Sequence, residues 1–432
     1  MIVLVFAVLV RAVYGVGTGA YERQHDWGGN NGHYQYVKII ATTGALPDNN
    51  DWQYYHPPLT HIVLAGGYAL LSNFVKTESG EPDDAKISDI LQVVPLIYSI
   101  LLLFVFLALL REFDAENLTG LLAFSFFALH PTNIILSASL NNDMLTYLLY
   151  GLSFLFTVRW YKDRSFPNII GIAVSIALSM LSKFSGVLIA PLVAVVFLVA
   201  FIQSVKKKTH VGRLVAQFAL FAAVCIPLGL SYTIRNFVLF GQPLGYVAYM
   251  GDNNWQYIDL PFIQRLFGYY APDFASPFSD AYRHKILSTA FKTSLFGEWG
   301  GHFGNYSDRF GETFRNIVAW TLTGAAAVTT AETAFLSVRY ALKKRKDAAG
   351  APVIKFFILG NIVLNIAFFL YFNYKYPFGC TADFRYLTPV LISAALVFVL
   401  GSEDFGKKAK IALAVPVIAF SALSAAFLTM FA

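Results

Sequence analysis

The chain has 432 residues, of which 56% are hydrophobic and 13% are charged, and its mean hydropathy is +0.56. This composition excludes an ordinary soluble domain and indicates a polytopic membrane protein. The net charge of +6 does not indicate nucleic-acid binding, because the basic residues form short clusters between apolar runs, as inward-facing loops do. The two cysteines, Cys225 and Cys380, give neither a disulfide framework nor a metal-ligand spacing.

Apolar runs close to the ~20 residues that cross a bilayer predict about eleven transmembrane helices in one all-α membrane domain, residues 1–432. The first run has no basic residues before it and no convincing cleavage site after it, so we expect an uncleaved helix rather than a secretory signal. The predicted helices lie near residues 1–17, 90–110, 118–137, 143–160, 168–182, 186–203, 212–231, 314–338, 354–372, 386–401 and 411–431.

A further apolar run, residues 59–75, is short, contains a glycine pair and follows two prolines, so it is also consistent with an interfacial or re-entrant segment. Charge decides between these interpretations. If this run does not cross, the first external loop holds nine acidic residues and the Lys and Arg clusters face the cytoplasm. The protein is then expected in the cytoplasmic membrane, with its N-terminus on the cytoplasmic side and its C-terminus on the external side. The expected inner segments are 111–117, 159–167, 203–213, 339–355 and 402–410.

Two long segments, 18–89 and 232–313, are therefore expected outside. Both are rich in Trp, Tyr, Phe, Gly and Asn. Aromatic belts at the membrane interface explain such a composition without any function. A sugar site needs the same residue types, because aromatic rings pack on sugar C–H surfaces while Asn, Asp and His meet hydroxyl groups. The composition alone is consistent with both.

The first external segment carries a candidate catalytic residue. Asp26 lies between His25 and Trp27 just beyond the first apolar run, where a half-desolvated carboxylate at the membrane surface can act as a general base. The same residue is also consistent with a helix cap, in which case the neighbouring glycines only form turns.

The order of motifs in this region resembles a known enzyme class. An apolar helix, the His25-Asp26 loop, Leu46-Pro47 and Tyr55-His56-Pro57-Pro58 resemble the GT-C class of membrane glycosyltransferases, in particular the protein-mannosyltransferase-like branch that uses polyprenyl-phosphate sugars. The resemblance implies a GT-C fold with juxtamembrane helices in the first external loop, and it implies that Asp26 is the catalytic Asp of that loop. One departure is that the frequent Asp-Glu pair of this branch is His25-Asp26 here.

A second polar motif, Asn141-Asn142-Asp143, follows the third predicted helix and is expected on the same face as Asp26. The two carboxylates can share an acceptor, or one can position the other. The motif is also consistent with the cap of a helix that begins at Met144. The resemblance implies an acidic residue in this second external loop, next to the donor site. Asp143 is therefore the second catalytic candidate, and Asn142 is a binding candidate.

Four cations lie near the predicted external edge of the bundle: Arg11, Lys183, Arg235 and Arg385. Arg or Lys at this edge can hold a lipid phosphate by charge-assisted hydrogen bonds. Snorkelling to the interface or pairing with an external acid is the other interpretation. The Arg-Tyr pair that begins at Arg385, followed shortly by a proline, resembles the same GT-C branch.

Four further residues complete the list of binding candidates. Glu298 and His302 flank a glycine pair and form either an acceptor-side wall or a structural turn. His33 and His56 contact either the substrate or a backbone carbonyl.

The sequence contains no HExxH or CxxC motif and no tight Asp/His cluster, so we expect neither a metal nor another cofactor. The function implied by the resemblance is an inverting glycosyltransferase, in which Asp26 takes the proton from an acceptor hydroxyl while a polyprenyl phosphate leaves. The expected partners are a polyprenyl-phosphate-linked sugar, a lipid, glycan or protein acceptor, and membrane lipid, without nucleic acid. The alternatives are a lipid-linked saccharide carrier or flippase without transferase activity, and a structural or sensor protein with an inactive site.

Overall fold

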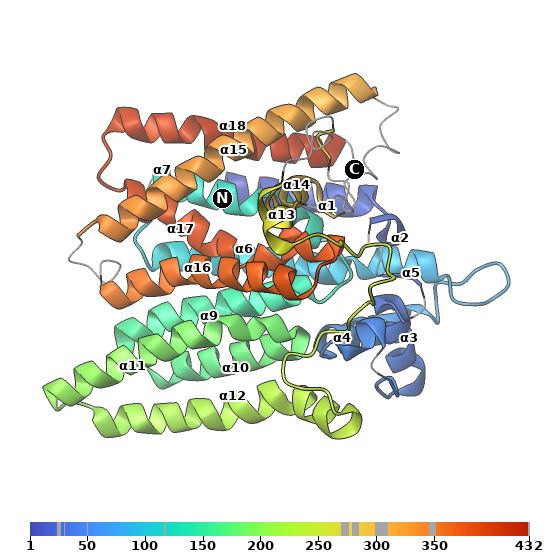
Figure 1. The fold of residues 1–432 in the computed structure, drawn as a ribbon, viewed down its shortest axis with the longest axis horizontal. Helices are drawn as coiled ribbons and strands as arrows, with labels where there is room; N and C mark the ends of the chain where they lie inside the picture. The colour runs from blue at the N-terminus through green and yellow to red at the C-terminus, as the bar shows by residue number, and fades with distance from the viewer. Residues whose placement is uncertain are drawn as a thin grey trace.

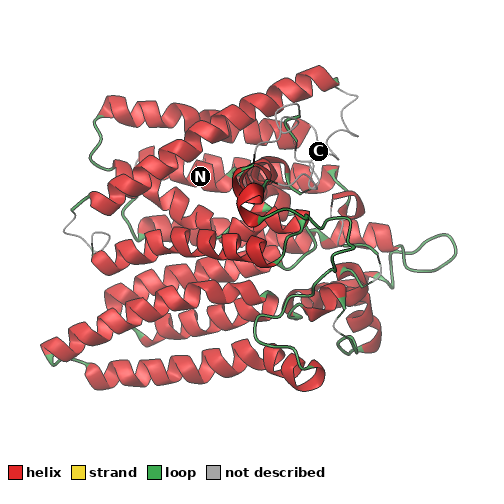
Figure 2. Ribbon diagram, viewed as in Figure 1, coloured by secondary structure: helices red, strands yellow, loops and turns green. Residues whose placement is uncertain are grey.

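The computed structural model describes residues 1–23, 27–29, 31–49, 51–115, 118–268, 276–278, 285–298, 310–344 and 351–430. Within these ranges the regular structure is helical apart from two isolated β-bridges, Lys76–Pro82 and Tyr257–Phe378. Helices form the body of the molecule, and most of the longer loops collect at one end (Figure 2). The all-α prediction is therefore confirmed for the described part of the chain.

The body is a bundle of helices that lie side by side (Figure 1). They are α1 (Ile2–Gly17), α6 (Val93–Arg111), α7 (Leu118–Ala128), α8 (Pro131–Leu136), α9 (Asp143–Asp163), α10 (Phe166–Ser182), α11 (Ala190–Lys207), α12 (Val211–Phe240), α15 (Glu312–Leu342), α16 (Pro352–Lys375), α17 (Val390–Ser402) and α18 (Lys407–Met430).

Each of the eleven predicted apolar runs overlaps one or two of these helices, with two corrections to their bounds. The run 118–137 is not one helix, because Pro131 has no N–H to continue α7 and instead begins α8. The run 212–231 continues to Phe240, where it ends at Gly241 with a φ of 65°. That left-handed conformation favours glycine and terminates the helix.

Five helical stretches are long and apolar enough to cross a membrane by length and composition: Asp84–Arg111, Phe184–Lys207, Val211–Phe240, Pro352–Lys375 and Lys407–Met430. Five shorter apolar helices of 10–17 residues accompany them in the described part of the chain. Large apolar side chains such as Ile226, Phe237 and Val363 face outward from α12 and α16, as side chains in contact with lipid do. The chain therefore has the features of a membrane protein, while the count of eleven crossings and the orientation stay predictions.

Short helices cover one end of the bundle, and we call this end the cap (Figure 1). They are α2 (Ala20–Arg23), α3 (His33–Thr43), α4 (Leu59–Leu71), α5 (Asp84–Leu91), α13 (Phe262–Phe267) and α14 (Ile286–Phe296). Helix α4 has 13 residues and is about 20 Å long, which is shorter than the ~30 Å hydrocarbon core. It packs on α3 around buried Trp27 and Tyr68, so this end of the molecule has a small core of its own.

The cap and the Lys-rich connection between α11 and α12 lie at opposite ends of the bundle (Figure 1). Lys206 and Lys207 are in the last turn of α11, and Lys208 begins the connection. This separation is what the positive-inside interpretation requires if the cap is external.

Candidate functional site

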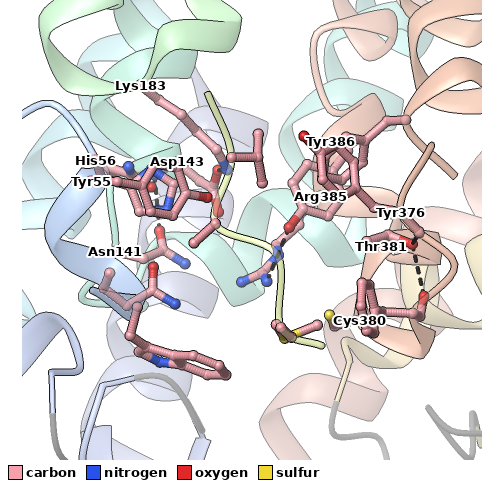
Figure 3. A pocket seen from close by; sticks show the side chains of 18 of the residues that line it. Tyr55, His56, Asn141, Asp143, Lys183, Tyr376, Cys380, Thr381, Arg385 and Tyr386 are labelled. Atoms are coloured by element: carbon pink, nitrogen blue, oxygen red, sulfur yellow. Dashed lines mark hydrogen bonds and ion pairs between the residues drawn. The ribbon is translucent and has the colours of Figure 1, made fainter. Parts of the chain in front are cut away.

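A cleft with about 850 Å³ of empty volume opens at the cap end of the bundle. It lies between the first long loop and the α9–α10 end on one side and the segment that joins α16 to α17 on the other. Figure 3 shows Tyr55, His56 and Asp143 facing Arg385 and Cys380 across this space. The polar residues that line it are His33, Gln53, His56, Asn141, Asn142, Asp143, Lys183, Gln256, Glu298, Thr381 and Arg385.

Asp143 is positioned where the start of α9 meets the end of α10. It is the first residue of α9, and its backbone N–H donates to Asn141 Oδ1 over 2.9 Å. Asn142 is at the N-cap position of α9, but its side chain makes no capping hydrogen bond. It donates instead to the carbonyl of Ser182 at the end of α10, over 3.2 Å. Thr146 Oγ1 donates to the Asn142 carbonyl over 2.6 Å, and it also lies within hydrogen-bonding distance, 2.9 Å, of Ser182 Oγ. These bonds fix the two helix ends together and hold Asp143 at the wall of the cleft.

Lys183 follows α10 and forms an ion pair with Asp143. Its ammonium also lies 4.8 Å from the centre of the Tyr386 ring, within the range of a cation–π contact. The chain then turns into the short helix η2 (Phe184–Ile189), which packs closely on α10 at Gly186. A Cβ at Gly186 would lie 2.2 Å from Ser179 Oγ. Only glycine fits this approach, and the approach sets the position of Lys183.

Arg385 lies on the opposite wall, in the short helix η8 (Phe384–Leu387). Its guanidinium Nη2 lies 3.5 Å from Glu298 Oε2, and its Nε lies 4.0 Å from Asp383 Oδ2. The Arg385 backbone N–H also donates to Asp383 Oδ1 over 2.8 Å. Glu298 reaches this position just after Gly297, whose φ of 72° is a conformation that glycine adopts readily.

The segment that carries Arg385 is held by hydrogen bonds to two helices. Asn373 of α16 donates to the Thr381 carbonyl over 2.9 Å, and Thr381 Oγ1 donates to the Tyr376 carbonyl over 2.8 Å. The Phe384 N–H donates to Thr293 Oγ1 of α14 over 2.9 Å. Arg385 is therefore presented by a fixed segment rather than by a free loop.

Asp383 is 5% exposed and lies behind Arg385. Burial raises the pKa of its carboxyl to about 6, although the nearby Arg385 guanidinium opposes this shift, and the Asp143 carboxylate raises it further. We call Asp143, Lys183, Glu298, Asp383 and Arg385 the charge cluster. When all five are ionised, this cluster holds three negative and two positive charges.

Histidines from the first long loop form the facing wall. His33 Nδ1 and His61 Nε2 are 2.8 Å apart and share a hydrogen bond, and the rings of His33 and His56 stack with their centres 5.9 Å apart. Burial lowers the pKa of His61 well below its ordinary value, and the neighbouring His33 acts in the same direction. His33 therefore has a side-chain hydrogen-bond partner, His61, in addition to its place in the cleft lining.

A second, mainly apolar hollow of about 950 Å³ adjoins the cleft, and we call it the groove. The two share Tyr55, His56, Lys183, Val247, Phe372 and Tyr386. The rest of its lining comes from η2, the end of α12, residues 242–247 and α16, and includes Phe184, Val187, Leu188, Tyr232, Pro243, Tyr246 and Phe368. A polar cleft and an apolar groove thus meet at Lys183.

Most of the described candidate residues converge on this cleft. Asp143, Asn142, Lys183, Arg385, Glu298, His33 and His56 all line it. Two predicted cations do not line it. Arg11 is buried in α1, where its Nε donates to Ser99 Oγ over 2.8 Å, and Arg235 donates to Asn236 and to the Pro47 carbonyl, over 3.0 and 3.5 Å. Asp26 and His302 lie outside the described residues.

Three features of the site were not selected from the sequence. Asp383 lies two residues before Arg385, and this spacing was the available signal for a carboxylate behind the guanidinium. Tyr386, adjacent to Arg385, contacts Lys183. His61 lies within the apolar run 59–75, and no neighbouring polar residue marked it as part of a site. No group of three or more His, Cys, Asp or Glu side chains suitable for a metal occurs among the described residues.

Comparisons with known proteins give limited similarity. Residues 91–280, less than half of the chain, match a family described as "Predicted membrane protein (DUF2142)". No curated protein matches significantly. Crystal structures of ArnT from Cupriavidus metallidurans are similar at 15% identity. The apo structure gives a TM-score of 0.38 over 92% of this chain and 77% of ArnT, and the undecaprenyl phosphate complex gives 0.39 over 94% and 78%. At these values we transfer no residue role from ArnT.

Proposed function

We propose that the protein is a membrane glycosyltransferase that binds a polyprenyl-phosphate-linked sugar and transfers the sugar to an acceptor hydroxyl on the outer face of the membrane. The observation that carries this proposal is the junction of the polar cleft and the apolar groove at Lys183. A ligand that fills both must have an anionic or polar head and a long apolar tail. A lipid-linked phosphosugar has this chemistry.

Lys183 and Arg385 are the proposed phosphate-binding residues. They approach the cleft from opposite walls, and their side chains are 12% and 15% exposed. A phosphodiester between them accepts charge-assisted hydrogen bonds from both. Because the departing polyprenyl phosphate is already anionic, these cations stabilise the leaving group and no acid is needed to protonate it.

The groove is the proposed site of the polyprenyl chain. Its aliphatic and aromatic lining from η2, α12 and α16 offers hydrocarbon an apolar surface, and the one Lys, Arg, Asp or Glu among the described lining residues is Lys183 at the head end. Burial of apolar surface contributes roughly 25 cal/mol per Å². Several isoprene units in the groove therefore supply much of the affinity, and the phosphate sets the register.

The sugar and the acceptor are proposed to occupy the part of the cleft that His33, His56, Asn141 and Gln256 line. These groups offer hydrogen bonds to sugar hydroxyls, and Trp52 and Tyr55 offer aromatic surface beside them. Asp26 stays the proposed general base, with Asp143 as a second carboxylate at the acceptor. A single displacement with one base inverts the anomeric carbon.

A carrier without transferase activity is the rival function. Such a protein needs its site to open alternately to both sides of the membrane. Here the described charged residues of the site lie at one end of the bundle, as do the cleft and the cap that borders it. This one-sided arrangement favours the transferase.

The test measures the product that is common to all sugars and acceptors. Membranes that contain the chain are supplied with a mixture of polyprenyl-phosphate sugars, and free polyprenyl phosphate is quantified by mass spectrometry. Asp26→Asn should abolish its formation. Loss of a charge-assisted hydrogen bond is worth about 1.5–3 kcal/mol, so Arg385→Gln should weaken donor affinity roughly 10- to 150-fold.

The control is Lys408→Met, an exposed residue at the other end of the bundle, which should leave the reaction unchanged. Mass spectrometry of glycolipids and glycoproteins from cells with and without the chain then identifies the acceptor. Transport of lipid-linked sugar that survives in Asp26→Asn, with no polyprenyl phosphate released by the unmodified protein, would identify the carrier instead.

A further inference from the structure

The charge cluster contains an excess of negative charge next to the proposed phosphate site. Asp143, Glu298 and Asp383 are separated from bulk solvent, with side-chain exposures of 8%, 14% and 7%. Only Lys183 and Arg385 balance them within the described cluster. The cluster therefore has a formal charge of −1 when every carboxyl is ionised.

An anion that binds between the two cations makes this imbalance larger. A phosphodiester carries one negative charge, so the occupied cluster would hold a charge of −2 in a largely buried setting. Buried charges without compensation are unfavourable, and the usual response is that one of the groups takes up a proton.

The geometry identifies the group best placed to do this. Asp383 lies behind Arg385 and not in the lining of the cleft, so protonating it removes a negative charge without blocking the ligand. Asp143 Oδ2 is buried and has no hydrogen-bond partner among the described residues, so this carboxylate meets its cation, Lys183, through Oδ1 alone. Burial and the Asp143 charge raise the pKa of Asp383 to about 6 in the empty cleft.

We propose that a lipid phosphodiester enters this cleft together with one proton, and that Asp383 takes up this proton. The inference rests on the proposed function, because it requires the cleft to bind a lipid phosphodiester. It adds that donor binding is linked to pH, and that Asp383 is a positioning residue that acts through Arg385. Protonation of Asp383 weakens its hold on the guanidinium, which is then available to the phosphate.

Other titratable groups near the cluster are the competing sites for this proton. Asp143 and Lys183 face Asp383 from α9 and from the end of α10, and Glu298 approaches Arg385 from the end of α14. His130, from the corner between α7 and α8, stacks on Phe384 with ring centres 5.6 Å apart. His33 and His56 line the far wall, and half-buried Tyr386 lies beside Arg385.

The test uses farnesyl methyl phosphodiester, which has a short isoprenoid tail and no second ionisation between pH 5 and 9. Binding to the full-length protein in a non-ionic detergent is followed by the fluorescence of Trp52, which lines the cleft, and by calorimetry. The dissociation constant should increase by about tenfold between pH 6.5 and 8. Calorimetry at pH 7 in two buffers of different ionisation enthalpy should give uptake of nearly one proton.

Asp383→Asn is the informative variant, because Asn can still accept the Arg385 N–H and the segment keeps its hydrogen bond. It should bind the probe at pH 8 about as tightly as at pH 6.5, with no proton uptake. Asp404→Asn is the matched control, since Asp404 follows α17 at its other end, about 20 Å away. It should retain the full pH dependence.

Different failures have different meanings. Probe binding without pH dependence or proton uptake overturns the linkage and leaves the proposed donor site in place. A pH dependence that persists in Asp383→Asn and disappears in His56→Gln assigns the proton to His56 and overturns the role of Asp383. No binding at any pH overturns both this inference and the proposed function.

Discussion

Replacing Lys183 by Met tests whether charge compensation between Asp143 and Lys183 stabilises the end of the bundle that forms the cleft. The side chains of Lys183 and Asp143 are 12% and 8% exposed, so the variant leaves a nearly buried carboxylate without its countercharge. Removing one partner of a buried pair costs about 3–5 kcal/mol. Met keeps most of the aliphatic stem of Lys, so lost packing contributes little.

This free energy converts to a measurable change in melting temperature. An unfolding entropy of about 2.1 cal/mol/K per residue gives roughly 0.9 kcal/mol/K for 432 residues. The Tm of Lys183→Met in detergent, followed by tryptophan fluorescence, should therefore be about 3–6 °C below that of the unmodified protein. Lys408→Met, an exposed residue at the far end of the bundle, should change Tm by less than about 1 °C.

The double variant Asp143→Asn/Lys183→Met separates charge from packing. It contains neither charge, so it should recover most of the lost Tm. It should still bind farnesyl methyl phosphodiester weakly, because the cation that receives the phosphate is absent. If the double variant melts as low as the single one, the loss comes from the contact of Lys183 with Tyr386, 4.8 Å from the ring centre, and the charge argument is refuted.

Three further predictions follow from single contacts. Cys380 lines the cleft and Cys225 is buried, so a maleimide should label Cys380 first, and the farnesyl probe should slow this labelling. Peptide mass spectrometry measures the labelling of both cysteines, and equal labelling would contradict the placement of Cys380 in the cleft. Burial raises the pKa of Asp383 to about 6, above its unfolded value of about 3.9, so its contribution to stability is fully present below pH 4 and is lost as pH rises through 6. The Tm difference between Asp383→Asn and the unmodified protein should therefore grow over that interval to an equivalent of at most ~3 kcal/mol, and a constant difference would contradict the shift. Gly186→Ala would place a Cβ 2.2 Å from Ser179 Oγ and should destabilise the protein by about 1–3 kcal/mol, whereas Gly212→Ala, with no atom within 4 Å, should be neutral in the same melting experiment.

Much of the fold could be predicted from the sequence because apolar length and charge act locally. The apolar runs gave the positions of the bundle helices, whereas the expectation from charge that α4 does not cross the membrane stays a prediction. The bounds were less predictable. Pro131 splits one run because a proline nitrogen cannot continue the helix, and α12 extends to Gly241 because no residue before it ends the helix.

The site could be predicted only in part, because a sequence gives the depth of a residue along a helix more reliably than its neighbours. Lys183 and Arg385 were selected at the external edge and both line the cleft. Arg11 was selected by the same criterion, yet its side chain is directed to Ser99 of α6. Asp383 was missed as a site residue because its importance depends on burial and on Asp143, which is 240 positions away in the chain.

The paired state of both cations also determines which anions the cleft can bind well. Lys183 is paired with Asp143, and Arg385 with Glu298, so an incoming phosphate only exchanges one anionic partner for another. This exchange reduces the net gain from the charges, so hydrocarbon in the groove must supply a large part of the affinity, at about 0.8 kcal/mol per buried CH₂. Affinity should therefore increase steeply from dimethyl phosphate to geranyl and then farnesyl methyl phosphodiester at one pH. If dimethyl phosphate binds as tightly as the farnesyl diester, the groove does not hold the lipid, and the junction of cleft and groove no longer supports a polyprenyl-phosphate donor.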